Sequence, residues 1–289
     1  MILWCDGPHP PDENMLRDAA LLATREAAHG DAALRGRPAG APGEAPREVL
    51  PGPEAVLRLF RFEPHGITLG RAQRPPAALD LARCRADGVP WAVRPTGGRA
   101  IFHAEEWTYS LVASIVDPRW GGSLSQAYER ASALVLRSLL RLGVPAELAA
   151  PDRAAGNLGR RTRPDLSCAA CFAATARHEI VLGGRKLVGS AQRRGARALL
   201  QQGSVLLGAG HERLADYIAV AESEKAAVRA ALAASATHAG AMLGPHPPLA
   251  RWADALMAEL PAGTRRFDAE AGACLLTLLE SASYTPQPL

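Results

Sequence analysis

Short runs of branched and aromatic residues, separated by Gly, Pro and Asp, constrain the fold of this 289-residue chain more than any other feature. Branched and aromatic side chains favour strands, and Gly, Pro and Asp interrupt them. Two of the later runs flank Gly183-Gly184, which is the pattern of a strand, a two-residue turn and a second strand. The sequence therefore predicts a sheet with strands at 56–62, 67–69, 91–94, 100–103, 108–114, 179–182, 185–188 and 199–207, the last broken at Gly203.

Helical spacing of apolar residues marks much of the remaining chain. The most regular example is 123–142, where Leu124, Val135 and Leu139 share one face and Gly143 follows the end. Further helices are predicted at 13–28, 211–220, 223–234, 249–260 and 268–281. These elements predict an α+β fold in which a mixed, mainly antiparallel sheet packs with helices. The expected organisation is a main body at 1–235 and a short helical C-terminal segment at 236–289.

Two polar stretches rich in Gly, Pro, Ala and Arg show no periodicity and are predicted to be loops, at 31–53 and 152–170. The second leads directly into Cys171. It is either a flexible loop over a site or a plain surface connection.

Charge and cysteine content limit the class of protein. The 33 basic residues outnumber the 29 acidic ones, and the net charge of +4 favours an acidic partner: nucleic acid, an anionic membrane or an acidic protein. Only two of the basic residues are lysines, Lys186 and Lys225, so each stands out in a chain that otherwise uses Arg. The five scattered Cys residues, with no targeting segment or 18-residue apolar stretch, lead us to expect a cytoplasmic protein.

Two short motifs invite a functional interpretation. Gly97 and Gly98 stand between predicted strands, where backbone N–H groups can face a ligand, although a plain hairpin has the same pattern. Cys168 and Cys171 have the spacing of a redox pair or of half a zinc site. No second ligand pair accompanies them, so no metal site is expected, and an inert buried thiol is an alternative for Cys171.

The order of the motifs resembles the lipoate-protein ligase and octanoyltransferase superfamily, which is related to the biotin-protein ligases. The resemblance covers most of the chain. It rests on Gly70-Arg-Ala-Gln73, on Arg94-Pro-Thr-Gly-Gly-Arg99 with His103, and on Thr108-Tyr-Ser110. It also rests on Cys171-Phe172 with Glu179, and on Gly184-Arg-Lys-Leu-Val-Gly-Ser-Ala-Gln-Arg193 with Gln201, Gly203, Ser204 and Leu206. The Cys-Phe pair upstream of the Lys segment, and Arg99 in place of a third Gly, are most similar to the Cys-dependent octanoyltransferases of the LipM type.

This resemblance implies a biotin/lipoate-ligase-like catalytic domain with Cys171 and Lys186 as its catalytic residues. It implies that substrate is bound by Arg94, Thr96, Gly97, Gly98, Arg99, His103, Gly189, Ser190, Ala191, Gln192, Gln202, Gly203 and Ser204. Two positions depart from the usual pattern. Gln202 stands where His is common, which puts a proton-carrying role there in doubt, and Ala104 stands where Asp is usual.

The implied reaction moves an octanoyl group from acyl carrier protein, through a thioester on Cys171, to a lysine of a lipoyl domain such as the glycine-cleavage H protein. A Cys nucleophile suits this exchange because one thioester replaces another. Lys186 would supply the cation that favours the thiolate, although a solvated strand-end charge is its alternative. No cofactor is expected. Ile101, Phe102, Leu111, Val188 and Leu206 could line an acyl channel or could belong to the ordinary core.

Two other functions fit parts of the sequence. An ATP-dependent lipoate-protein ligase would use ATP and Mg to make an adenylate and would need no covalent Cys intermediate. A non-catalytic module would bind lipoyl proteins, or nucleic acid through arginines such as those at 193, 194 and 197. Nucleic acid is disfavoured because aromatic residues do not alternate with these arginines and no helix-turn-helix pattern surrounds them.

Overall fold

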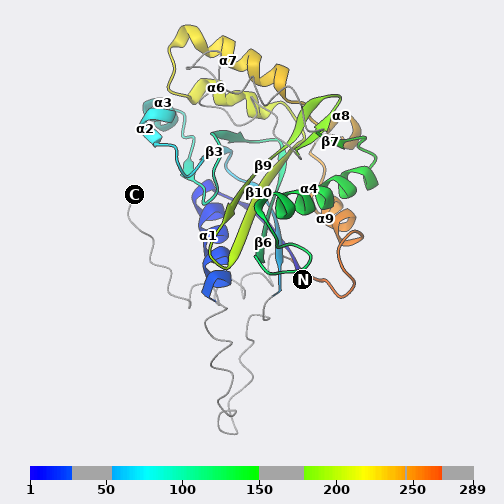
Figure 1. Cartoon of the computed structure of the whole chain (residues 1–289). Helices are drawn as coiled ribbons and strands as arrows, with labels where there is room; N and C mark the ends of the chain where they lie inside the picture. Colours follow the sequence, from blue (N-terminus) through cyan, green and yellow to red (C-terminus); the bar gives the residue numbers. More distant parts are fainter. Residues whose placement is uncertain (28–53, 150–178, 245, 269–289) are drawn as a thin grey trace.

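An eight-stranded sheet is the scaffold of the protein in the computed structural model, which describes residues 1–27, 54–149, 179–244 and 246–268 (Figure 1). In spatial order its strands are β11 (Arg265–Asp268), β1 (Ile2–His9), β2 (Val56–Phe62), β6 (Glu106–Ser114), β10 (Ala198–Leu206), β9 (Arg185–Arg194), β8 (Ile180–Leu182) and β7 (Glu147–Leu148). β1 pairs in parallel with β2 and β11, and the remaining pairs are antiparallel. The predicted mixed, mainly antiparallel sheet is confirmed.

A second, three-stranded sheet carries the predicted Gly loop. Its order is β4 (Trp91–Val93), β3 (Gly66–Leu69) and β5 (Ile101–His103), with β3 parallel to β4 and antiparallel to β5. The loop 94–99 joins β4 to β5, so both of its ends are held by the same central strand. Four helices cover this sheet and share its apolar cluster: α2 (Pro75–Ala78), α3 (Leu81–Ala86), α6 (Leu214–Tyr217) and α7 (Glu222–Ser235).

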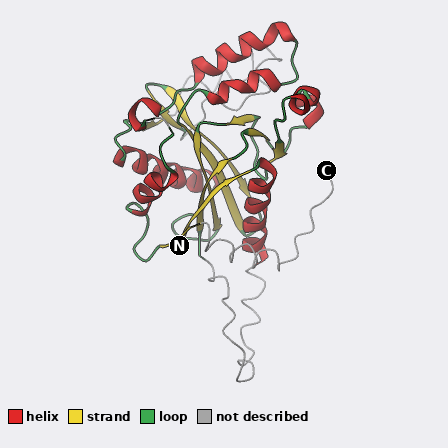
Figure 2. Cartoon of the chain, turned by 180° about the vertical axis from the view of Figure 1, so that it is seen from behind, coloured by secondary structure: helices red, strands yellow, loops and turns green. Residues whose placement is uncertain are grey.

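Helices lie on both faces of the large sheet (Figures 1 and 2). α1 (Pro11–Ala27) covers one face, and α4 (Leu124–Arg141) with α9 (Leu249–Met257) covers the other. Two short helical turns, η3 (Gly210–Arg213) and α8 (Gly240–Leu243), complete the described chain. The pattern is the packing of amphipathic helices against a sheet that is buried on both sides.

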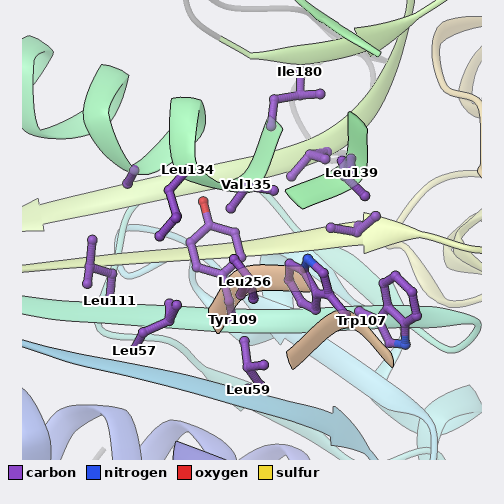
Figure 3. Close-up of a cluster of buried hydrophobic side chains, with 14 of the residues drawn as sticks. Leu57, Leu59, Trp107, Tyr109, Leu111, Leu134, Val135, Leu139, Ile180 and Leu256 are labelled. Carbon is purple, nitrogen blue, oxygen red and sulfur yellow. The ribbon is translucent and has the colours of Figure 1, made fainter. Parts of the chain in front are cut away.

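The main hydrophobic core fills the space between the large sheet and the α4–α9 pair. Figure 3 shows Leu134 and Val135 of α4 next to the Tyr109 ring of β6, with Leu139 of α4 near Ile180 of β8. The Trp107 and Trp252 rings stack with centroids 5.4 Å apart. A cluster of buried apolar groups of this size supplies most of the stabilisation of a domain.

Two local predictions are confirmed in detail. α4 begins with Ser123 as its N-cap in a reciprocal capping box with Gln126, and Gly143 beyond its end has a φ of 83°. The Gly183-Gly184 turn has positive φ at both residues, 57° and 73°, which is the conformation that the tight hairpin turn between right-twisted strands requires.

Several predicted elements need correction. β1 was not predicted, although it lies between two partners inside the sheet. β10 does not break at Gly203, which pairs with Tyr109 of β6. A Cβ atom on Gly203 would lie 2.5 Å from the Tyr109 ring, so the glycine is needed for close packing. The helix expected at 211–220 is a 3₁₀ turn followed by the four residues of α6.

The C-terminal segment is not wholly helical. Residues 265–268 form β11, a strand that pairs with β1, and α9 ends at Met257 and packs into the main core. The helix predicted at 268–281 lies outside the described residues from 269 onward, and the loops predicted at 31–53 and 152–170 lie wholly outside them. No helix in the described ranges has both the length and the apolar character needed to cross a membrane.

Candidate functional site

Arg94 organises the Gly loop from within. Its side chain is 4% exposed, and its guanidinium donates to the carbonyl oxygens of Gly97 at 2.8 Å and Arg99 at 2.7 Å. A further N–H of Arg94 lies 3.2 Å from both the carbonyl and the hydroxyl of Thr68 on β3. Five rigid N–H donors suit this task, so Arg94 fixes the path of the loop between two strands.

The loop approaches the neighbouring chain closely at Gly70. A Cβ atom on Gly70 would lie 2.0 Å from the carbonyl oxygen of Gly98, and the φ of Gly98 is 90°. The Gln73 side chain accepts the Gly70 N–H at 3.0 Å, and Arg71 N–H donates to the Thr96 carbonyl at 2.9 Å. The Gly-x-x-Gln motif is therefore the structural support of the Gly loop.

A buried relay connects the Gly loop to helix α1 through β10. Thr96 Oγ1 donates to Gln202 Oε1 at 2.7 Å, and Gln202 Nε2 donates to Asp18 Oδ2 at 2.6 Å. Asp18 is fully buried and also accepts from Ser110 Oγ at 2.6 Å. Gln202 thus uses both ends of its amide, which a glutamine can do without changing protonation state.

The negative charge of Asp18 is balanced by Arg58 of β2, which is also fully buried. Arg58 Nη1 lies 2.8 Å from Asp18 Oδ1, and Nε lies 2.7 Å from Asp6 Oδ2. Asn14 accepts two more hydrogen bonds from the same guanidinium, one at its carbonyl and one at its side chain. A buried charge persists only when it is paired and hydrogen-bonded in this way.

A second polar cluster surrounds His103 at the end of β5. His103 Nδ1 lies 2.6 Å from Glu106 Oε1, and Nε2 lies 2.7 Å from Thr68 Oγ1. Phe62 stacks on the imidazole with centroids 3.8 Å apart. Both ring nitrogens and one ring face are therefore constrained, which fixes the position of the imidazole.

Glu106 concentrates its hydrogen bonds on one oxygen. Its Oε1 accepts from Thr108 Oγ1 at 2.7 Å and from Ser204 Oγ at 3.0 Å, in addition to the His103 contact. Its other oxygen, Oε2, is buried and receives no hydrogen bond from the described residues. The nearby His211 has a pKa below its usual value because it is desolvated, an effect that the charge of Glu106 partly opposes. The Glu106 carboxylate thus lies among polar groups that stabilise a negative charge.

These clusters meet at a narrow pocket of about 30 Å³. The predicted site residues that line it are Arg94, His103, Gly189, Ser190, Ala191, Gln202, Gly203 and Ser204. Thr96 does not line the pocket, but it donates a hydrogen bond to Gln202, which does. Gly97, Gly98 and Arg99 lie in the adjoining loop, and Gln192 lies beside Gln201, with their side-chain amides 3.1 Å apart. Most of the predicted substrate-binding set is therefore gathered in one place.

Lys186 is buried but does not line this pocket. Its ammonium lies 2.5 Å from Glu179 Oε1, and 1% of the residue is exposed. Val181 pairs with Lys186 and Ile180 pairs with Val188, so β9 carries one extra residue at this point. Such a bulge bends a strand and redirects its side chains. The interpretation of Lys186 as a solvated charge is wrong.

Cys168 and Cys171 lie outside the described residues.

Of the five residues considered for an acyl channel, one lines the pocket and the others belong to the hydrophobic clusters. Ile101 lines the pocket, whereas Leu111 and Val188 belong to the main core and Phe102 and Leu206 to the smaller cluster. A larger cavity of about 700 Å³ lies next to the pocket: Phe62 lines both, and Glu106, the partner of His103, lines the larger one. Arg61 also lines the cavity, and burial lowers its pKa.

Sequence reasoning missed Thr68, Glu106, Asp18 and Arg58. Two of the four had a detectable signal: Arg58 stands between Leu57 and Leu59 in a strand, and Asp18 lies on the apolar side of a helix. A charged residue at a core position requires a partner, so its presence indicates a second charge nearby.

Across the described ranges, no group of three His, Cys, Asp or Glu side chains could hold a metal ion.

The sequence of residues 47–261 matches the lipoyl protein ligase A/B catalytic domain. The chain belongs to this lipoyl protein ligase family. Among curated proteins it is 40% identical over 159 residues to the octanoyltransferase LipM of Kyrpidia tusciae, covering 55% of this chain and 57% of the relative. It is 37% identical over 201 residues to the octanoyltransferase LipM of Symbiobacterium thermophilum, covering 70% and 63%. The matched part thus spans about three fifths of the length of these relatives.

Solved structures of the lipoyl protein ligase family share the fold. A bipartite lipoate protein ligase from Thermoplasma acidophilum superposes with a TM-score of 0.60 at 15% identity, over 96% of this chain and 91% of its own. A lipoate-protein ligase A bound with ATP superposes with a TM-score of 0.59 at 15% identity, over 96% and 94%. The predicted lipoate-ligase fold is confirmed.

Proposed function

We propose that this protein is an octanoyltransferase that modifies lipoyl domains. The observation that carries the proposal is the 40% identity to a protein named octanoyltransferase LipM, supported by a second such relative over 201 residues. The site agrees with this function, because eight predicted substrate-binding residues converge on one pocket beside a rigid Gly loop. The donor is octanoyl-acyl carrier protein, and the acceptor is the lysine of a lipoyl domain such as that of the glycine-cleavage H protein.

Cys171 is the nucleophile in this proposal. Its thiolate attacks the donor thioester, a new C–S bond forms, and the carrier thiol leaves with a proton. About 3% of an ordinary thiol is ionised at pH 7, so the thiolate needs support from a neighbouring cation. Lys186 suits this role because its ammonium is a compact charge held at a buried position next to Glu179. No nucleotide takes part, because the donor thioester is already activated.

The experiment is transfer between purified proteins without ATP. The enzyme is incubated with octanoyl-acyl carrier protein, and its intact mass is measured before a lipoyl domain is added. The expected result is one octanoyl adduct that hydroxylamine removes, followed by octanoylation of the lipoyl domain. Cys171→Ser removes both the adduct and turnover, whereas the matched control Cys168→Ser keeps both.

An ATP-dependent ligase is the runner-up, since a ligase with bound ATP has the same fold. Transfer only in the presence of ATP and free lipoate would select it. An adduct on Cys168, or parental turnover by Cys171→Ser, would overturn the assigned nucleophile.

A further inference from the structure

The second half of the proposed reaction requires a base. A lysine amine has an ordinary pKa of about 10.4, so roughly one amine in 2,500 is unprotonated at pH 7. The Cys thiol, with an ordinary pKa of about 8.5, needs much less help. Transfer from the thioester to lysine therefore needs a group that takes a proton from the incoming ammonium.

Among the described residues that line the pocket, His103 alone carries an imidazole, the side chain that most often serves as a general base. The guanidinium of Arg94 is permanently protonated, and the other lining side chains are hydroxyl, amide, thioether or hydrocarbon. The pocket volume of about 30 Å³ is enough for a single water or an amino group next to the imidazole.

The environment of His103 stabilises the imidazolium that would result. Nδ1 faces Glu106 at 2.6 Å, and the carboxylate is held by Thr108 and Ser204. Since Glu106 Oε2 receives no hydrogen bond from the described residues, the negative charge is only partly compensated. A proton gained by His103 places a positive charge next to the Glu106 carboxylate. The imidazolium of a Ser-His-Asp triad lies next to its Asp carboxylate in the same way.

Thr68 connects the imidazole to the pocket. Its hydroxyl lies 2.7 Å from His103 Nε2, and Thr68 itself lines the pocket. Arg94 lies 3.2 Å from the same hydroxyl oxygen, so the Thr68 hydrogen is directed at Nε2. A hydroxyl in this position can accept a proton from an amine on one side while it gives its own to the imidazole on the other.

We propose that His103 is the base for lysine attack and that Thr68 relays the proton to it. This inference rests on the proposed function. The ammonium loses one proton through Thr68 to His103 Nε2, and the amine forms a C–N bond with the acyl carbon. The C–S bond to Cys171 breaks as the second amine proton passes to the departing sulfur, which leaves a Cys thiol. His103 then returns its proton to solvent.

The test separates the two half-reactions. Octanoyl-enzyme is prepared from the parent and from His103→Gln, whose amide can hydrogen-bond to Thr68 and Glu106 but is not a base at neutral pH. Rapid-quench mass spectrometry follows acylation by the donor, discharge to a saturating lipoyl domain, and discharge to hydroxylamine, which is largely unprotonated at neutral pH. The exposed His238, replaced by Gln, is the matched control.

For His103→Gln we expect discharge to lysine to slow by about 100-fold or more, with acylation, discharge to hydroxylamine and KM for the lipoyl domain unchanged. Discharge to lysine at the parental rate would overturn the proposal. An equal loss in all three reactions would assign His103 a structural role and would also overturn it.

Thr68 provides a second, independent pair of variants. Thr68→Val removes the hydroxyl with little change in shape, and Thr68→Ser retains it. Thr68→Val should slow only the discharge to lysine, and Thr68→Ser should not. Similar rates for both would contradict the relay even if His103→Gln fails to fold. Absence of any octanoyl adduct on the parent enzyme is the separate outcome that contradicts the proposed function.

Discussion

The two faces of strand β6 are both buried, but between Glu106 and Leu111 their chemistry is opposite. Along β6, Trp107, Tyr109 and Leu111 pack against α4 and α9, whereas Thr108 and Ser110 bond to Glu106 and Asp18 on the other face. Every residue of this strand is buried. Burial therefore does not distinguish the core from the site. What differs is how the buried atoms are satisfied, by close packing on one face and by charge pairing on the other.

Loss of Arg58 should have the largest effect on stability. Arg58→Met removes the cation that faces the buried carboxylate of Asp18 and one of the two that face Asp6, which keeps Arg17. We expect the free energy of unfolding to fall by about 3–5 kcal/mol. Urea denaturation followed by circular dichroism measures this change. A loss below that of an ordinary surface substitution would show that the polar face does not depend on this charge pairing.

A truncation on the apolar face should cost less and should spare the chemistry. Leu134→Ala opens a cavity among the side chains shown in Figure 3, and we expect a loss of about 3 kcal/mol of stability. At a temperature where the variant stays folded, turnover per folded molecule should equal that of the parent. Reduced turnover at full folding would mean that the two faces are coupled.

Lys186 sharpens the comparison because it is a buried cation on β9, the strand that also supplies residues 189–191 to the pocket. Lys186→Arg keeps the charge, but the planar guanidinium is larger and cannot reproduce the Glu179 contact in the same space. We expect the rate of octanoyl transfer to fall by about tenfold or more, which corresponds to about 1.4 kcal/mol. Lys225→Arg, a lysine on α7, is the matched control. Near-parental rates for Lys186→Arg would remove its catalytic assignment.

The smallest effect is expected at Thr96. Thr96→Val removes one hydroxyl and with it the hydrogen bond to Gln202, which costs about 1 kcal/mol. Because the Gly loop loses its link to Asp18, KM for the donor should rise more than kcat falls. Thr96→Ser retains the donor group and should restore KM. Equal values of KM in the Val and Ser variants would show that the relay does not position the loop.

Local signals in the sequence predicted most strands and the principal helix. Runs of branched residues, the apolar spacing that ends at Gly143 and the two glycines of the 183–184 turn each extend over a short stretch of chain, so each can be recognised locally. β1 escaped prediction because Gly7 and Pro8 interrupt its polar end, although Ile2, Leu3 and Trp4 form a strand-like run. Its identity as a strand depends on β2 and β11, which are distant in the chain.

The candidate site divides in the same way. The Gly loop and the 189–191 segment were predicted from a family resemblance, and they line or adjoin one pocket. The partners Asp18, Arg58 and Glu106 come from three separate elements, and no local pattern states which charge meets which. Gln202 illustrates the difference, since its departure from the usual His could be read from the sequence but its contact with Asp18 could not.

The pairing of β1 with β11 has a consequence for the order in which the protein assembles during synthesis. Ile2 pairs with Arg265, so one edge of the first strand cannot be completed until nearly all of the described chain has left the ribosome. β2 can dock on the other edge much earlier, because Ile2 pairs with Val56. Contacts between such distant residues form late and slow the completion of folding. Until then the nascent chain exposes an open strand edge, a surface that chaperones can protect from association with other chains.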